Sequence, residues 1–191
     1  FITSSLGPLP QVEQAVKAVE GGCSWIELAP GESLAATAEA LVERLKGQDV
    51  FLVLPDDADL ADRLRVHGVV LSSPEPKTVA ETRERLGAHA VIGVRVSSAQ
   101  EAVDLRAIDI DYIIYGVPAD ADGAAEKWQA FRKALDKGNV PFHAVASGDF
   151  TPETAAALRA GGAAGVAVSA PVATAADPAE AARLYVNALQ G

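Results

Sequence analysis

The chain lacks most of the features that mark membrane, secreted and zinc-binding proteins. Its 191 residues contain no apolar run of about eighteen residues, the length that a membrane-spanning helix needs. The single cysteine, Cys23, excludes an internal disulfide and the usual zinc sites built from several cysteines. The opening residues show neither a basic stretch nor a cleavage pattern, so we expect no signal peptide, no membrane partner and a cytoplasmic location.

Positive charge is also scarce. The chain has 16 Lys and Arg residues against 26 Asp and Glu residues, which gives a formal net charge of −10. A nucleic-acid partner is therefore not expected, because a phosphate backbone is bound by clustered Lys and Arg side chains. An anionic small ligand would need local compensation, from the N-termini of helices or from a divalent cation.

Several familiar catalytic patterns are missing as well. No Ser-His-Asp grouping and no Glu-x-x-His motif is readable in the sequence. All the lysines fall in predicted helices rather than at strand ends, which argues against an aldolase that forms a Schiff base. His67, His89 and His143 precede predicted strands or lie at their starts, and we expect structural roles for them.

The sequence does contain a regular alternation of short β-branched segments and longer, alanine-rich amphipathic segments. This alternation is typical of repeated βα units around a parallel sheet. It predicts eight strands, at residues 1–4, 24–28, 50–54, 68–71, 91–94, 112–115, 142–145 and 165–168. It also predicts eight helices, at residues 11–20, 34–46, 58–65, 77–86, 98–107, 126–137, 152–160 and 178–189.

Eight βα units favour a (β/α)8 TIM barrel, a single compact α/β domain over residues 1–191. The alternative, a doubly wound open sheet, usually has fewer strands and a glycine-rich first turn that this chain does not have. Small barrels often pair, and Trp25 and Trp128 are candidate contacts of a homodimer, although the sequence does not fix the oligomeric state.

Ligands of such barrels bind where the strands end. The turns after the last two predicted strands, Gly148-Asp149 and Ser169-Ala170, offer small residues and backbone N–H groups to a phosphate. Gly116, which follows the sixth predicted strand, lies at the same end. These positions predict a phosphorylated small-molecule ligand, and the alternative is that the turns are tight connections with no ligand.

Charged residues also follow the middle strands. Asp56 and Glu75 come after adjacent predicted strands and form a candidate Mg²⁺ site, because Mg²⁺ prefers carboxylate oxygens completed by water and substrate phosphate. The alternative is that both are solvated loop acids near helix starts, where carboxylates are favoured. Arg95 follows the fifth strand as a candidate ligand of phosphate or carboxylate, and it is equally able to pair with Glu75 or Asp56.

The chain resembles thiamine phosphate synthases and the related thiazole tautomerases, which are (β/α)8 barrels. EGGCSWIEL (20–28) is similar to the family's passage from helix to second strand, and HGVVLSSPEP (67–76) to its Gly-Val-His-Leu-Gly turn. VIGVRVSSAQEA (91–102) resembles its Ile-Gly-x-Ser strand. The segment at 140–172, VPFHAVASGDFTPETAAALRAGGAAGVAVSAPV, resembles its Ala-Ile-Gly-Gly-Ile-Thr block and Gly-Val-Ala-Val-Ser turn. The resemblance covers nearly the whole chain.

The resemblance implies a transferase of thiamine biosynthesis that joins a pyrimidine diphosphate to a thiazole phosphate and releases pyrophosphate with the help of Mg²⁺. It implies that Glu27 contacts the pyrimidine and that Asp56 and Glu75 bind the metal. The resemblance assigns the thiazole phosphate to the last two turns, at residues Gly148, Asp149, Ser169 and Ala170.

The chain departs from the family pattern at several of these positions. Where the family has Gln-Leu-Arg followed by lysine, this chain has Glu27-Leu28-Ala29 and Gly31, which removes two cations. The serine after strand five is Arg95, a candidate replacement for a lost cation, and the second glycine of the phosphate turn is Asp149. A second hypothesis is therefore a non-catalytic barrel that binds a thiamine precursor or a protein partner.

Overall fold

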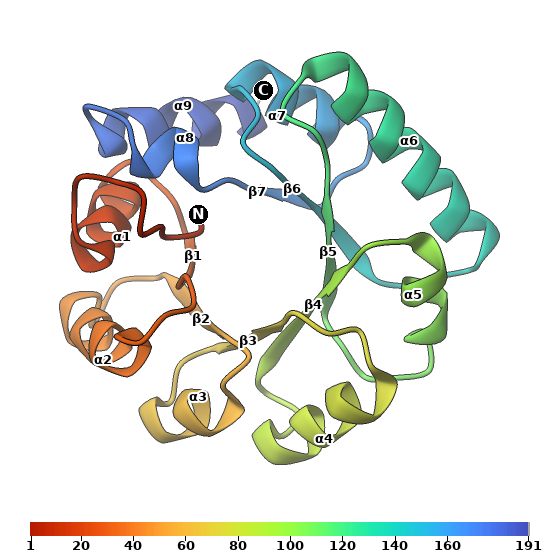
Figure 1. Ribbon diagram of the computed structural model, residues 1–191, viewed down its shortest axis with the longest axis horizontal. Helices are drawn as coiled ribbons and strands as arrows, with labels where there is room; N and C mark the ends of the chain where they lie inside the picture. Colours follow the sequence, from red (N-terminus) through yellow and green to blue (C-terminus); the bar gives the residue numbers. More distant parts are fainter. Residues whose placement is uncertain (191) are drawn as a thin grey trace.

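The computed structural model describes residues 1–190, whose strands form one seven-stranded sheet in the order β1-β2-β3-β4-β5-β6-β7. Every pairing is parallel, and the sheet curls into a ring that the helices surround (Figure 1). The strands are β1 (Trp25–Glu27), β2 (Phe51–Pro55), β3 (Gly68–Leu71), β4 (Val91–Val96), β5 (Tyr112–Gly116), β6 (His143–Ser147) and β7 (Gly165–Ala167). The predicted α/β architecture with a parallel, curled sheet is confirmed.

The helices pack on the outside of the ring (Figure 1). They are α1 (Gln11–Glu20), α2 (Leu34–Arg44), α3 (Ala58–Leu64), α4 (Pro76–Leu86), α5 (Ala99–Asp104), α6 (Ala121–Lys137), α7 (Pro152–Ala160), α8 (Ala170–Ala173) and α9 (Pro178–Gln190). Side chains cap several of them: Asp57, Ser98, Asp120 and Thr151 accept a hydrogen bond from a backbone N–H of the first turn. No helix of residues 1–190 combines the length and apolar character that crossing a membrane requires.

Three helix predictions need correction. The helix predicted at 126–137 begins five residues earlier, at Ala121, because the carboxylate of Asp120 accepts the N–H of Gly123 and starts the helix there. The helix predicted at 98–107 ends at Asp104. The short helix α8 was not predicted, since its four residues, Ala-Pro-Val-Ala, are too few to show a helical apolar periodicity.

The first predicted strand, residues 1–4, is wrong as an extended strand. It forms only an isolated bridge between Ile2 and Glu27, in place of a full ladder. The Thr3 N–H donates to the Glu27 carbonyl (2.9 Å), and the Ile2 N–H donates to the Val168 carbonyl (2.9 Å) beyond the end of β7. The N-terminal segment therefore contacts both edges of the sheet, and Figure 1 shows it between β1 and β7.

The main core lies between the ring and the helices. Its largest fully buried side chains include Trp128, Phe150, Ile26 and Leu28. Trp128 is only 1% exposed and donates its indole N–H to the Gly161 carbonyl (3.0 Å), so its predicted place in a dimer interface is wrong. A second, smaller cluster inside the ring contains Val53, Val70, Tyr112 and Ile114, with Trp25, Val91 and Val145 packed against it.

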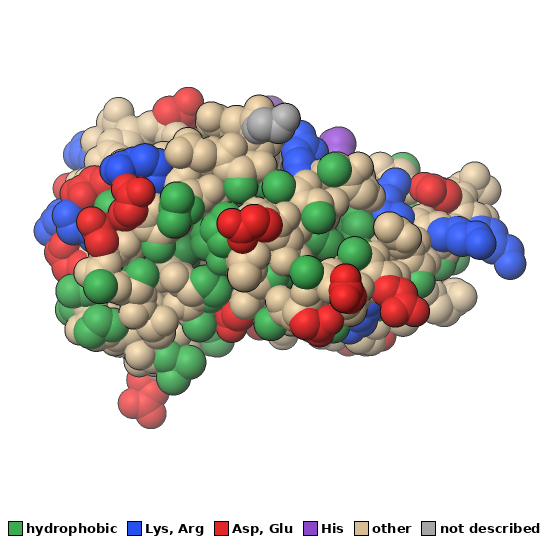
Figure 2. Space-filling view, turned by 90° about the horizontal axis from the view of Figure 1, so that it is seen from above, with side chains coloured by type: hydrophobic (Ala, Val, Ile, Leu, Met, Phe, Trp, Pro, Cys, Tyr) green, Lys and Arg blue, Asp and Glu red, His purple; other side chains and the backbone are tan. Residues whose placement is uncertain are grey.

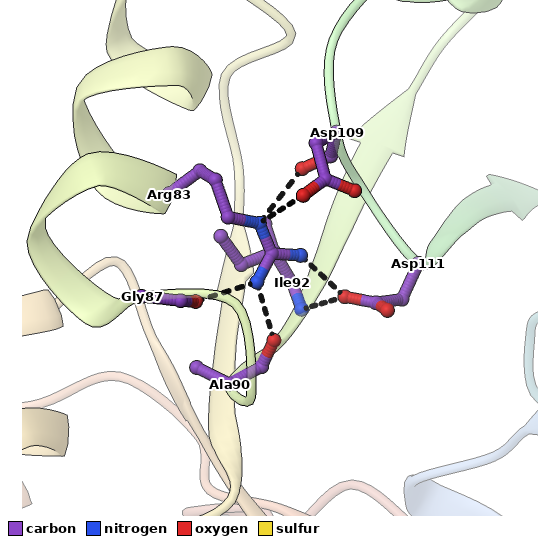
Figure 3. A network of polar contacts seen from close by, with 6 residues as sticks. All are labelled: Arg83, Gly87, Ala90, Ile92, Asp109 and Asp111. Carbon is purple, nitrogen blue, oxygen red and sulfur yellow. Dashed lines mark hydrogen bonds and ion pairs between the residues drawn. The ribbon is translucent and has the colours of Figure 1, made fainter.

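Arg83 on α4 ties together the loops that precede β4 and β5 (Figure 3). Its guanidinium donates to the carbonyls of Gly87 (2.9 Å), Ala90 (2.6 Å) and Asp109 (2.9 Å). It also pairs with the Asp111 carboxylate (2.8 Å), which accepts the Ile92 N–H at 2.8 Å. These bonds fix the end of the ring where the strands begin.

Figure 2 shows how charged side chains are distributed over one face of the molecule. On the face drawn in Figure 2, acidic side chains lie among the basic ones, and no broad patch of basic side chains is visible.

Candidate active site at the strand ends

Glu27 and Arg95 form an ion pair across the ring. Glu27 ends β1 and its side chain is 7% exposed, whereas Arg95 lies on β4 with its side chain 33% exposed. The Arg95 guanidinium donates to a carboxylate oxygen of Glu27. The two predicted catalytic residues are thus in contact, a pairing that the sequence did not predict.

The Glu27 carboxyl lies in a buried environment that changes its pKa. Its burial raises its pKa above the ordinary value, and the opposing effect of the Arg95 charge and hydrogen bond does not cancel this rise. The nearby charge of Asp56 raises the pKa further. Glu27 therefore holds a proton more tightly than an exposed glutamate does.

The predicted phosphate turn is occupied by the protein itself. The carboxylate of Asp149 accepts hydrogen bonds from the backbone N–H groups of Ala170 (3.1 Å) and Ser169 (3.4 Å), at the start of α8. These are the amides that the sequence predicted for a phosphate. A carboxylate is an anion with the same preference for backbone N–H groups, so Asp149 stands where a phosphate oxygen was expected.

The two predicted glycines of this end differ in their surroundings. A Cβ at Gly148 would lie 2.7 Å from the Val117 carbonyl oxygen, so only glycine fits there without a shift. The Gly148 N–H already donates to the Ala167 carbonyl (3.1 Å). Gly116 ends β5 with nothing within 4 Å of an added Cβ, so the space beside it is open to a ligand.

The predicted metal ligands Asp56 and Glu75 lie at the same end but each has a protein partner. Asp56 follows β2 with a positive φ of 51°, and its carboxylate accepts the Ser72 N–H at 2.7 Å. Glu75 precedes α4 and accepts the Thr78 hydroxyl at 3.0 Å. Residues 1–190 contain no group of three or more His, Cys, Asp or Glu side chains arranged to hold a metal ion.

Two residues that support this end were not predicted. The Tyr185 hydroxyl, from α9, donates to the Phe150 carbonyl and fixes the loop that carries Asp149. Gln14 on α1 is fully buried and binds the backbone of Ser4 and Leu9, which fixes the loop after the N-terminal segment. A glutamine on the otherwise apolar face of a helix was the available signal for Gln14.

Comparison with known proteins gives a consistent result. The family model described as thiamine monophosphate synthase matches residues 2–172. The thiamine-phosphate synthase of Bacteroides thetaiotaomicron is 29% identical over 98% of this chain and 95% of its own length. That of Azorhizobium caulinodans is 31% identical over 95% of this chain and 87% of its own length.

Solved structures with a similar fold were also found. A solved structure of the thiamine phosphate pyrophosphorylase from Pyrococcus furiosus superimposes with a TM-score of 0.82, covering 99% of this chain and 93% of that chain at 24% identity. A 3-hexulose-6-phosphate synthase superimposes with a TM-score of 0.73 at 23% identity, over 98% and 99% of the two chains. The family model, which matches most of the chain, and the two similar thiamine-phosphate synthases show that the chain belongs to the thiamine monophosphate synthase family.

Proposed function

We propose that this chain joins a pyrimidine diphosphate to a thiazole phosphate and releases pyrophosphate, the reaction named for its relatives in thiamine biosynthesis. The observation that carries the proposal is the Glu27–Arg95 pair, a buried carboxyl and an arginine that face each other where barrel strands end. We also propose that the N-terminal segment acts as the eighth strand and closes a (β/α)8 barrel, since it bonds to Glu27 on one side and Val168 on the other.

In the proposed reaction the thiazole nitrogen attacks the pyrimidine methylene carbon. The bond between that carbon and the diphosphate oxygen breaks, and pyrophosphate leaves with the electron pair. Arg95 stabilises the negative charge that develops on the leaving group, as a positioned cation does best in a site shielded from water. Glu27 contacts the pyrimidine and balances the positive charge that develops on that ring.

Mg²⁺ would be held by Asp56 and Glu75, each of which uses one carboxylate oxygen for a protein donor in residues 1–190 and leaves the other oxygen free. This donor set fits the ion's preference for one or two carboxylates completed by substrate phosphate and water. The bound ion would neutralise charge on the diphosphate.

The thiazole phosphate would bind at Gly116, Gly148, Ser169 and Ala170 after displacing the Asp149 carboxylate from the two backbone amides. The competition between the two anions predicts weak binding of thiazole phosphate by this chain. A glycine at position 149 would remove the competitor.

A second candidate function is that of a non-catalytic barrel, and the contacts of Asp149 and Glu27 favour it. Asp149 satisfies the amides without any ligand, and the Glu27 carboxyl is already paired with Arg95. Such a protein would bind a thiamine precursor or another protein and would not turn over.

One assay distinguishes the two candidate functions. The purified chain is incubated with pyrimidine diphosphate, thiazole phosphate and Mg²⁺, and thiamine phosphate is measured by chromatography. Arg95→Gln should lower kcat by about 10²- to 10³-fold, whereas Arg44→Gln, at an exposed arginine on α2, should leave it unchanged. Product no greater than without protein rejects the synthase proposal, and calorimetry with each substrate then tests the binding function.

A further inference from the structure

The hydroxyl of Thr3 lies beside the strand end that carries Glu27. Thr3 is only 1% exposed, and the proposed reaction assigns it no role. Its hydroxyl accepts the N–H of Ala29, two residues beyond Glu27, at 2.8 Å. It donates in turn to the side-chain carbonyl of Gln11, the first residue of α1, at 2.7 Å. Because the hydrogen of the hydroxyl points to Gln11, a lone pair of its oxygen is left to face the Ala29 N–H.

The backbone of Glu27 is held on one side by the N-terminal segment. The Glu27 N–H donates to the Phe1 carbonyl (2.9 Å), and the Glu27 carbonyl accepts the Thr3 N–H (2.9 Å). In a parallel ladder that continued, the Ala29 N–H would donate next to the Thr3 carbonyl. It donates to the Thr3 hydroxyl instead, so a side chain replaces the backbone in the last bond of this pairing.

The chain leaves the sheet directly after Thr3. The Ser4 N–H donates to the side-chain carbonyl of Gln14 (2.9 Å), and the Ser4 carbonyl accepts the Gln14 amide N–H (2.8 Å). Gln14 lies on α1, so the backbone of Ser4 is bound to that helix and not to the turn after β1. This turn therefore depends on the Thr3 hydroxyl for its bond to the N-terminal segment.

Glu27 needs this support because β1 is short. The strand has three residues, and Glu27 is the last of them. A ladder with β2 holds it on one side, but on the other side it has only the isolated bridge to Ile2. The Glu27 carboxyl must nevertheless stay in contact with Arg95 across the ring. A misplacement of about 1 Å in a catalytic site can cost about 10²-fold in rate, so a loosened strand end would lower turnover.

We propose that Thr3 is a positioning residue for Glu27: by binding the Ala29 N–H, its hydroxyl keeps the Glu27 carboxyl where it meets both Arg95 and the pyrimidine. The effect on turnover rests on the proposed function. The hydrogen bond to the turn does not, and it is tested separately.

Thr3→Val keeps the branched shape and removes the hydroxyl, whereas Thr3→Ser keeps the hydroxyl. Thr3→Val should lower kcat by about ten- to hundredfold. The KM for thiazole phosphate should change by less than about twofold, because that substrate is proposed to bind at other turns. Thr3→Ser should restore kcat to within about threefold of wild type. The control is Thr82→Val, since Thr82 is also buried and donates to the Thr78 carbonyl (2.8 Å) within α4; its kcat should equal that of wild type.

A double-mutant cycle tests whether Thr3 acts through Glu27. In a Glu27→Ala background the carboxyl is gone, so adding Thr3→Val should lower kcat by less than about twofold further. An equal loss in both backgrounds overturns the positioning role. So does an unchanged kcat in Thr3→Val, or a Thr3→Ser variant as slow as Thr3→Val.

Hydrogen exchange gives a readout that needs no activity. Thr3→Val should speed exchange of the Ala29 amide by about tenfold, because the amide loses its acceptor. The Ile92 amide, which donates to the Asp111 carboxylate at the other end of the ring (2.8 Å), should keep its wild-type rate. Unchanged exchange at Ala29 overturns the proposal whatever the activity. If wild type forms no thiamine phosphate, the synthase proposal fails, and the Ala29 exchange rate alone decides whether Thr3 holds the turn after Glu27.

Discussion

Arg83 should be worth more to stability than any exposed arginine of this chain. Its side chain is 13% exposed and serves five acceptors at once, three backbone carbonyls and the carboxylates of Asp109 and Asp111. In Arg83→Met the apolar stem stays and the donors are lost. The Ala90 carbonyl, which is half-buried, then lacks a partner, while the exposed Gly87 and Asp109 groups return to water.

The magnitude follows from these surroundings. An unpaired, half-buried carbonyl costs about 1–3 kcal/mol, and a hydrogen bond to a half-exposed carboxylate contributes about 1 kcal/mol. We therefore expect Arg83→Met to lower the free energy of unfolding by about 3 kcal/mol. At this chain length that corresponds to a fall in Tm of roughly 6–12 °C.

Arg85 on the same helix is the control. It contacts two carboxylates, Asp59 at 2.9 Å and Asp62 at 3.4 Å, but its side chain is 53% exposed. Arg85→Met should therefore cost no more than about 1 kcal/mol. Urea unfolding followed by circular dichroism measures both variants at one pH and salt concentration. If Arg83→Met loses no more stability than Arg85→Met, burial of the guanidinium is not what makes its network stabilising.

Three further predictions concern the strand ends and the sheet. Asp149→Gly should bind inorganic phosphate more tightly than wild type in calorimetry, because it frees the amides of Ser169 and Ala170; equal binding refutes the competition. The raised pKa of Glu27 means that the folded chain holds this proton more tightly, so stability falls as pH rises from the unfolded value of 4.5 through the raised folded pKa. The urea midpoint of Glu27→Gln, compared with that of wild type, should therefore increase between about pH 4 and neutrality. If the two midpoints change in parallel with pH, the pKa of Glu27 is not raised. Gly68→Ala should lower the unfolding free energy by about 3 kcal/mol or more, because its Cβ would lie 1.8 Å from the Val91 carbonyl oxygen, and a wild-type Tm excludes that clash.

The alternation of βα units predicted most of the fold because its signals are local. Each strand from β1 to β7 overlaps a predicted β-branched segment, and caps such as Asp57 and Thr151 lie next to the helices that they start. The prediction of an extended strand at residues 1–4 failed for a different reason. Its composition is that of a strand, but the length of its pairing depends on the distance between β1 and β7, which no local pattern encodes.

The candidate site was predictable only in its position. Glu27 and Arg95 were each found as strand-end residues, but their contact joins β1 to β4 across the ring and depends on which faces point inward. From the sequence, Asp149 was recognised as an anionic residue next to the expected phosphate site. That its carboxylate takes the Ser169 and Ala170 amides follows from the approach of two turns, twenty residues apart, which a pattern of residue types does not measure.

The bonds of the N-terminal segment also bear on how the molecule folds. All pairings from β1 to β7 join strands that are consecutive in the chain, so each can form from one contiguous βα unit. The bond from Ile2 to Val168 instead joins nearly opposite ends of the chain, and its loop-closure entropy is the largest in the sheet. The ring should therefore close late in folding and open first, with the Ile2 amide exchanging its hydrogen long before those of β4 and β5.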